Sequence, residues 1–197
     1  LGMLLATLMG LPLGVFSAVK QYSGADSFLR VASTVLVAMP TFWLAMLLIL
    51  VFALYLGWLP AGEASSWKSY ILPTITVGVP YGSKVLRMTR STMLEEIRQD
   101  YIRTARSKGV PEKRVIYGHA LKNALLPVIT TIGSAFGAIL GGSVIAESVF
   151  NLSGLGSFIV LSIKAKDTRS VLASVLLLAV FFALFMLFTV NVVILRI

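Results

Sequence analysis

The sequence predicts an all-α polytopic membrane protein, and three observations lead to this prediction. The 197 residues are 57% hydrophobic, with a mean hydropathy of +0.91, and only 13% of them are charged. These values lie outside the range of soluble domains. Five segments are apolar over about 20 residues, the length that a helix needs to cross a bilayer core of roughly 30 Å. The charges are also clustered, which argues against the solvated basic face of a nucleic-acid-binding domain.

We expect the five membrane helices at approximately 1–19, 31–57, 71–92, 124–146 and 171–195. Pro40 lies inside the second segment, where proline permits a bend. The third segment carries Lys84, Arg87 and Arg90 at intervals of three residues, so they fall near one side of a helix and reach the interface or a polar neighbour. Small residues are frequent in the fourth segment, which suits close helix packing or, as an alternative, the lining of a pathway.

The distribution of Lys and Arg predicts the orientation, because cytoplasmic loops carry an excess of these residues. One side of the membrane receives Lys20, Arg30, the cluster from Arg87 to Lys122, and Arg196; the other receives Lys68, Lys164, Lys166 and Arg169. Loop 93–123 is therefore expected to be cytoplasmic, and segments 58–70 and 147–170 external. Trp58 and Trp67 flank the first external segment, as interfacial aromatic residues do.

Residues 93–123 form a polar, basic segment whose pattern predicts a helix–turn–helix hairpin. The first helix is expected from about Glu95 to Lys108 and the second from Pro111 to about Leu121. Gly109 suits the left-handed position that ends a helix, and Pro111 suits the first turn of the next one. A hairpin that only binds anionic lipid through its basic side chains is an alternative, and a DNA-binding hairpin is a weaker one.

The same residues resemble a known family. In the cytoplasmic loop of permease subunits of ATP-binding-cassette (ABC) importers, Glu-Ala-Ala is followed by three residues and a glycine. Here Arg103-Thr104-Ala105 is followed by Arg106-Ser107-Lys108 and Gly109, and both this variation and HALKNALLPV (119–128) resemble the dipeptide/oligopeptide/nickel type. Further segments resemble this family in the family's order, namely 10–20, 37–49, 56–62, 71–95 and 146–156.

The resemblance implies the transmembrane-domain fold of a type I ABC importer, with residues 1–197 as a single domain. It also implies that the family's first membrane helix precedes residue 1, so we expect the domain to be partial at its N-terminus. The hairpin, residues 95–122, would be the element that couples the permease to its ATPase. The coupling residues implied are Asp100, Tyr101, Arg103, Thr104, Ala105, Arg106, Lys108, Gly109 and Val110, with Tyr101 and Val110 as apolar anchors and with His119 and Asn123 supporting the hairpin.

The function implied is that of a permease subunit in the prokaryotic plasma (inner) membrane. It would form half of an alternating-access pathway for peptides, a nickel chelate or a related small solute. Its partners would be a second permease subunit, identical or paralogous, two cytoplasmic ABC ATPase subunits, an external substrate-binding protein and the bilayer, with no nucleic acid. ATP and magnesium would bind to the ATPase subunits, and no cofactor is expected on this chain, which has no phosphate-binding Gly-x-x-x-x-Gly-Lys-Ser/Thr loop.

Two other classes of function remain as alternatives. A membrane enzyme needs catalytic groups at membrane depth, and the expected spans contain no Ser–His or Asp–Asp arrangement. A secondary carrier or channel would need buried ionisable residues, for which Lys84 is the main candidate. The absence of cysteine excludes thiol chemistry, and a single histidine, His119, argues against a metal site built on histidine. The residues that would contact the solute are not predicted.

Overall fold

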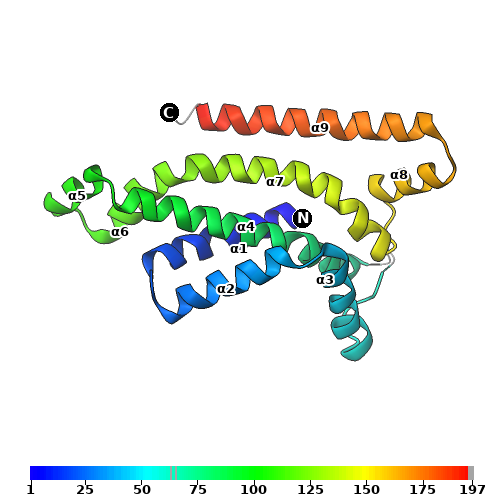
Figure 1. Cartoon of the computed structure of the whole chain (residues 1–197), viewed down its shortest axis with the longest axis horizontal. Coiled ribbons are helices and arrows are strands. Elements are labelled where there is room, and N and C mark those ends of the chain that lie inside the picture. The colour runs from blue at the N-terminus through cyan, green and yellow to red at the C-terminus, as the bar shows by residue number, and fades with distance from the viewer. Residues whose placement is uncertain (63, 65, 195–197) are drawn as a thin grey trace.

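The computed structural model describes residues 1–62, 64 and 66–194, and every regular element within them is helical (Figure 1). The α-helices are α1 (Gly2–Val19), α2 (Gly24–Ala38), α3 (Thr41–Leu48), α4 (Ile71–Ile97), α5 (Asp100–Ser107), α6 (Glu112–Arg114), α7 (Leu121–Val149), α8 (Leu155–Lys164) and α9 (Thr168–Ile194). Two π-helical segments, η1 (Ile49–Tyr55) and η3 (Val115–Ala120), and a 3-10 segment, η2 (Trp67–Tyr70), connect to them.

Three of the described helices are long and apolar enough to cross a membrane: Gly2–Val19, Glu112–Gly141 and Thr168–Asn191. A fourth crossing results if the bent pair Gly24–Ala38 and Thr41–Tyr55 counts as one span. The expected crossing at 71–92 lies in α4, whose 27 residues give a length of about 40 Å but whose second half is basic. The fifth expected helix corresponds to α9; residue 195 and Arg196 lie outside the described residues.

The expected membrane segment over 31–57, in which Pro40 was predicted to permit a bend, is sharply broken in the structure. The chain bends by 105° between α2 and the segment formed by α3 and η1. Met39 precedes Pro40 and has an extended backbone with ψ of 128°, because the proline ring disfavours a helical conformation in the residue before it. The helix restarts at Thr41, directly after the proline, and α3 projects from the bundle (Figure 1).

Helix α4 is the centre of the bundle, since α1, α2, α3 and α7 all pack against it. The approach of α1 is close enough that glycine is required: a Cβ on Gly14 would lie 2.6 Å from Thr89 Cβ and 2.7 Å from the Leu86 carbonyl oxygen. Lys84 Nζ lies 4.8 Å from the centre of the Tyr81 ring, so this cation has an aromatic neighbour on its own helix.

An apolar cluster holds together the end of the bundle opposite the hairpin. Phe150 and Leu72 are fully buried there, and the half-buried Phe52 of η1 packs against the same cluster. The turn between α7 and α8 uses Asn151, whose φ is 48°, and the amide of Ser157 in the first turn of α8 donates to the Glu147 carboxylate at 2.9 Å. The turn therefore lies at Asn151, and Leu155 already begins α8.

Candidate functional site

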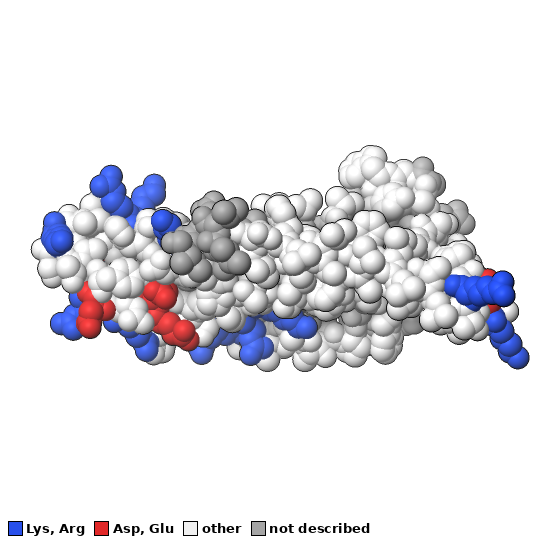
Figure 2. Space-filling view, turned by 90° about the horizontal axis from the view of Figure 1, so that it is seen from above, with Lys and Arg blue, Asp and Glu red and all other residues white. Residues whose placement is uncertain are grey.

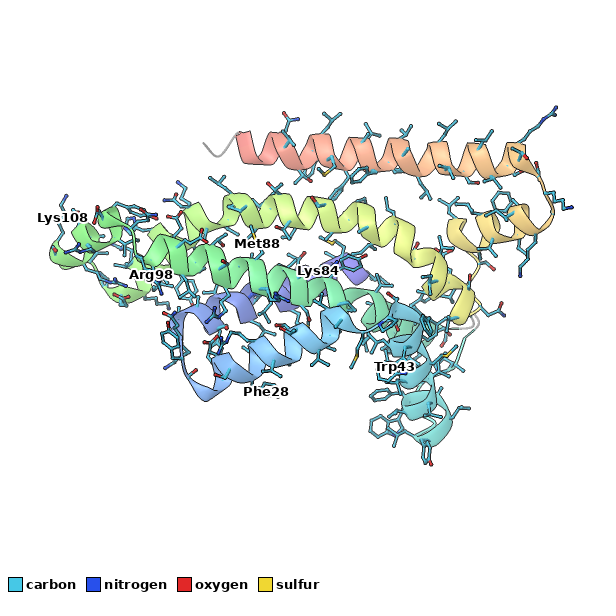
Figure 3. The ribbon with its side chains drawn as sticks, viewed as in Figure 1. Phe28, Trp43, Lys84, Met88, Arg98 and Lys108 are labelled. Carbon is cyan, nitrogen blue, oxygen red and sulfur yellow. The ribbon has the colours of Figure 1, made fainter. Side chains whose placement is uncertain are left out.

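The hairpin lies at one end of the molecule, beyond the ends of the long helices (Figures 1 and 3). Its first helix, α5, begins at Asp100 rather than near Glu95, because α4 continues to Ile97 before the chain breaks. The expected separate second helix, Pro111 to Leu121, is wrong as well: α6, η3 and α7 follow one another without a break. Two long helices, α4 and α7, therefore hold the hairpin directly.

Gly109 makes the turn of the hairpin, as the sequence predicted. Its φ is +76°, a left-handed conformation that glycine adopts without a steric penalty. The amide of Gly109 donates to the Arg106 carbonyl at 3.0 Å and that of Val110 donates to the Ala105 carbonyl at 3.2 Å. This pair of bonds is a Schellman motif, which satisfies the last carbonyls of α5 and fixes the direction in which the chain leaves the helix.

An ion pair closes the turn from outside. Arg106 donates through Nη2 to Glu112 Oε1 at 2.7 Å and through Nε to Glu112 Oε2 at 3.1 Å. Both side chains are partly exposed, at 39% and 60%, so the pair adds little to global stability. Its two parallel bonds define the distance between α5 and α6 instead.

The inner face of the hairpin packs on an apolar cluster that joins it to the bundle. Ile102 of α5 is fully buried and packs in one cluster with Met93 of α4 and Val115 of η3. Ala105 and Val110 are half-buried against the same cluster, so these two predicted coupling residues face the chain's own core. Ile102 was not singled out from the sequence, although its position between two polar residues suits an anchor.

Tyr101 connects the hairpin to both long helices that carry it, α4 and α7. Its hydroxyl donates to the carboxylate of Glu96 in the last turn of α4 and accepts from Asn123 Nδ2 of α7 at 2.9 Å. Burial and, after it, the Glu96 hydrogen bond raise the pKa of Tyr101, so its hydroxyl keeps the proton that it donates. Asn123 of α7 thus contacts the hairpin through its hydrogen bond to Tyr101.

The outer face of the hairpin is exposed and basic. Lys and Arg side chains gather at this end of the molecule, with a smaller group at the opposite end (Figure 2). Thr104 and Lys108 lie exposed at the tip, whereas Arg103 and Arg106 line a cleft toward the end of α1. His119 is exposed, and the described part of the chain gives its ring no hydrogen-bond partner.

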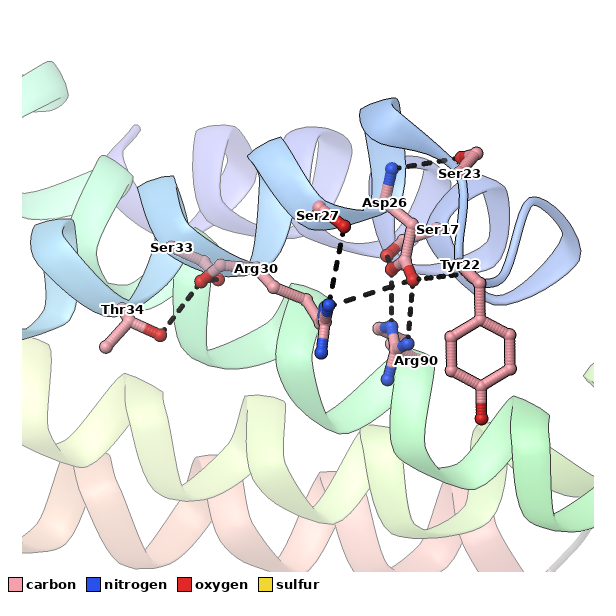
Figure 4. A network of polar contacts seen from close by, with 9 residues as sticks. All are labelled: Ser17, Tyr22, Ser23, Asp26, Ser27, Arg30, Ser33, Thr34 and Arg90. Carbon is pink, nitrogen blue, oxygen red and sulfur yellow. Dashed lines mark hydrogen bonds and ion pairs between the residues drawn. The ribbon is translucent and has the colours of Figure 1, made fainter.

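A buried ion pair joins the helices of the bundle and was not predicted from the sequence (Figure 4). Asp26 is fully buried at the start of α2 and accepts from Arg90 of α4 through Nε at 2.7 Å and Nη2 at 2.9 Å. Ser17 Oγ of α1 donates to the same carboxylate at 2.6 Å, and the amide of Tyr22 donates at 3.0 Å. One carboxylate thereby joins α1, α2 and α4. Asp26 lies three residues after Ser23, the N-cap of α2, and this spacing was the available signal.

The sequence profile of a family described as "Binding-protein-dependent transport system inner membrane component" matches residues 10–195. Among curated proteins, the chain is similar to the glutathione transport system permease protein GsiC of Salmonella typhimurium strain LT2, with 41% identity over 182 residues. It is 40% identical over 182 residues to GsiC of Escherichia coli strain K12. Each match covers 92% of this chain and 60% of the relative, so the chain spans about three fifths of the length of these relatives.

Among solved structures, the chain is similar to inward-facing conformations of the MetNI methionine ABC transporter. The TM-score is 0.78, the sequence identity is 16%, and the match covers 100% of this chain and 89% of the other. At this identity the likeness shows the fold alone. It confirms the predicted transmembrane-domain fold of a type I ABC importer.

Proposed function

The chain belongs to the family of binding-protein-dependent transport system inner membrane components, and on this premise we propose that it is a membrane-spanning permease subunit of an ATP-driven importer and forms half of the translocation pathway. It is a multi-pass inner-membrane permease subunit by family, and the bond-breaking step would belong to partner subunits that bind ATP and magnesium. The whole transporter would contain a second permease subunit, two cytoplasmic ATPase subunits and an external solute-binding protein.

The hairpin is the observation that carries this proposal. A coupling element must move as a rigid body, because a flexible loop would dissipate a displacement imposed at its tip. Here Ile102 anchors the inner face, Tyr101 bridges α4 and α7, and Arg106 with Glu112 closes the turn. These contacts support a mechanism in which a push on the exposed tip moves both membrane helices together. The hairpin would then lie on the cytoplasmic side, in agreement with the distribution of Lys and Arg.

Five of the nine predicted coupling residues divide into two groups in this proposal. Thr104, Lys108 and Gly109 would contact the ATPase, because they are exposed at the tip. Ala105 and Val110 would keep the tip in place, because they pack on the chain's own apolar cluster. Helices α4 and α7 reach from the hairpin to the opposite end of the bundle. Their motion would therefore open or close the pathway at the end where the solute enters.

For the solute, the curated relatives favour a small peptide. Their names describe glutathione transport, and glutathione is a tripeptide. We therefore propose that the pathway carries a short peptide or a molecule of similar size and polarity.

Cysteine crosslinking tests the coupling role, since the chain contains no cysteine of its own. Ser107→Cys places a thiol beside the tip, and Ser66→Cys places an equally exposed thiol near the opposite end. Each variant of the complete subunit is co-expressed with its ATPase subunits and treated with a bifunctional thiol reagent, with and without nucleotide. We expect a nucleotide-sensitive crosslink to the ATPase from Ser107→Cys and none from Ser66→Cys. A correctly inserted complex without a crosslink at Ser107→Cys would contradict the coupling role.

A further inference from the structure

A cleft of about 450 Å³ lies between the hairpin and the end of α1, and the proposed coupling role assigns no ligand to it. Its floor is aliphatic, with Val19 from α1, Leu94 and Ile97 from α4 and Ile116 from η3. We call it the arginine cleft because Arg98, Arg103 and Arg106 line it together with a single carboxylate, Glu112.

Two of the three arginines are not neutralised by a neighbouring carboxylate, so their charge is available to a ligand. Arg106 is matched by Glu112 through two hydrogen bonds. Arg103 has its ion-pair contact with Asp100, at 3.7 Å, and that carboxylate is 96% exposed to water, so the contact neutralises little. Arg98 is exposed and has no Asp or Glu oxygen within 4.0 Å among residues 1–62, 64 and 66–194. The cleft is therefore electropositive and suited to an anion that accepts from guanidinium groups.

The cleft opens at the level where an apolar membrane helix ends. The apolar stretch of α1 stops at Val19, and Lys20 follows it. Phe16 lies one helical turn before Val19 on the same side of α1, and these two side chains are 45% and 46% exposed. An apolar surface thus leads from the floor of the cleft along the outside of the membrane helix. A molecule that fits both parts has an anionic head and a hydrocarbon tail.

We propose that the arginine cleft binds the phosphate headgroup of an anionic phospholipid, with Arg98 and Arg103 as the phosphate ligands. Basic pockets between membrane helices on the cytoplasmic side are suited to such headgroups. The acyl chain lies against Val19 and Phe16, which a free phosphate would leave bare. This assignment rests on the proposed function in one respect, the cytoplasmic position of the hairpin. A bound lipid then adds to the apolar contact that Val15 and Ala18 of α1 already make with the hairpin base in the cluster around Ile102.

Native mass spectrometry of the complete purified permease tests the proposal. The protein is exchanged into detergent that contains phosphatidylglycerol and phosphatidylcholine with identical acyl chains, and the retained lipid is counted. The test variant is Arg98→Gln/Arg103→Gln. The matched control is Lys113→Gln/Arg114→Gln, which removes the same charge from exposed residues of α6 that do not line the cleft. We expect wild type and control to retain phosphatidylglycerol, and the test variant to bind it about 30-fold more weakly.

Four results would overturn the assignment. Equal losses in the two double variants would show a general charge effect, and equal retention of phosphatidylcholine would show that the headgroup charge is not recognised. Displacement of phosphatidylglycerol by inorganic phosphate at millimolar concentration would show a site for a free anion. A crosslink from Gln21→Cys, a residue that lines the cleft, to an ATPase subunit in lipid-containing membranes would show a protein contact instead. The lipid assay contains no ATPase, so its failure leaves the Ser107→Cys result unaffected.

Discussion

Replacement of Asp26 by asparagine is expected to destabilise the bundle by about 3–5 kcal/mol, because it removes one partner of a buried ion pair. Asparagine has nearly the shape of aspartate, so the substitution changes charge and hydrogen bonding while it leaves the packing intact. The Asp26 side chain is fully buried, and Arg90, its partner, is only 16% exposed.

The structure gives the origin of this free energy. The carboxylate accepts from Arg90 through both oxygens, at 2.7 and 2.9 Å, and from Ser17 and the Tyr22 amide at 2.6 and 3.0 Å. Asparagine replaces one of the two oxygens by an NH₂ group, which cannot accept a hydrogen bond. At the position of Oδ1 this group would face the donors of Arg90 and Ser17, and at the position of Oδ2 those of Arg90 and Tyr22. Two hydrogen bonds are lost, at least one of them to a charged group, and each such charged bond contributes about 1.5–3 kcal/mol.

Unfolding of the purified complete permease in mixed detergent, followed by tryptophan fluorescence, measures the loss. Asp100→Asn is the matched control, because its carboxylate is 96% exposed and lies 3.7 Å from Arg103. We expect Asp100→Asn to be close to wild type. The double variant Asp26→Asn/Arg90→Gln should recover part of the lost stability, since it leaves no unpaired buried charge; Arg30, the other cation near Asp26, is 50% exposed. Equal stability of Asp26→Asn and Asp100→Asn would refute the argument.

Three further variants test the packing of the bundle and the hairpin. Gly14→Ala should cost about 1–3 kcal/mol in the same unfolding assay, because a Cβ there would lie 2.6 Å from Thr89 Cβ; Gly24→Ala, with nothing within 4 Å, should cost far less, and equal losses would contradict the close approach of α1. Ile102→Ala should cost about 2–5 kcal/mol of hairpin anchoring and speed hydrogen exchange in α5; unchanged exchange would show that the buried side chain is not an anchor. Tyr101→Phe removes both hydrogen bonds of the hydroxyl, so exchange in residues 100–107 should rise without a change in global unfolding, and a rise elsewhere would place the role of Tyr101 outside the hairpin.

The turn of the hairpin was predictable because its signals are local. Gly109 needs a left-handed φ, and the two bonds that end α5 join residues within the same few positions. The second half of the hairpin was not predictable in the same way. The sequence predicted a separate short helix from Pro111 to about Leu121, whereas the burial of Val115 and Ala120 against the hairpin base holds α6, η3 and α7 in one continuous run.

Two other features depend on contacts distant in the sequence. Pro40 marked a bend in 31–57, but the angle of 105° goes with the packing of the α3–η1 segment on α4 and α7, in the cluster that contains Phe150. Asp26 and Arg90 are 64 residues apart, so no periodicity relates them. Arg90 was expected to reach the interface or a polar neighbour, and the structure provides the neighbour.

Helix α9 has a consequence for how the protein is made. Only 6% of its most apolar stretch of 18 residues is buried within the chain, and the mean hydropathy of this stretch is 3.0. The helix packs chiefly against α7 and α8. Such a segment enters the bilayer on its own hydrophobicity, as the first stage of membrane-protein assembly requires, and the bundle around α4 can form before α9 docks. The positions of α9 that face away from α7 and α8 are then free to drift among Leu, Ile, Val and Phe. Phe185, which stacks on Phe136, and the residues around Asp26 and Gly14 are not. Mutational tolerance should therefore be high along α9 and low along the contact between α1 and α4.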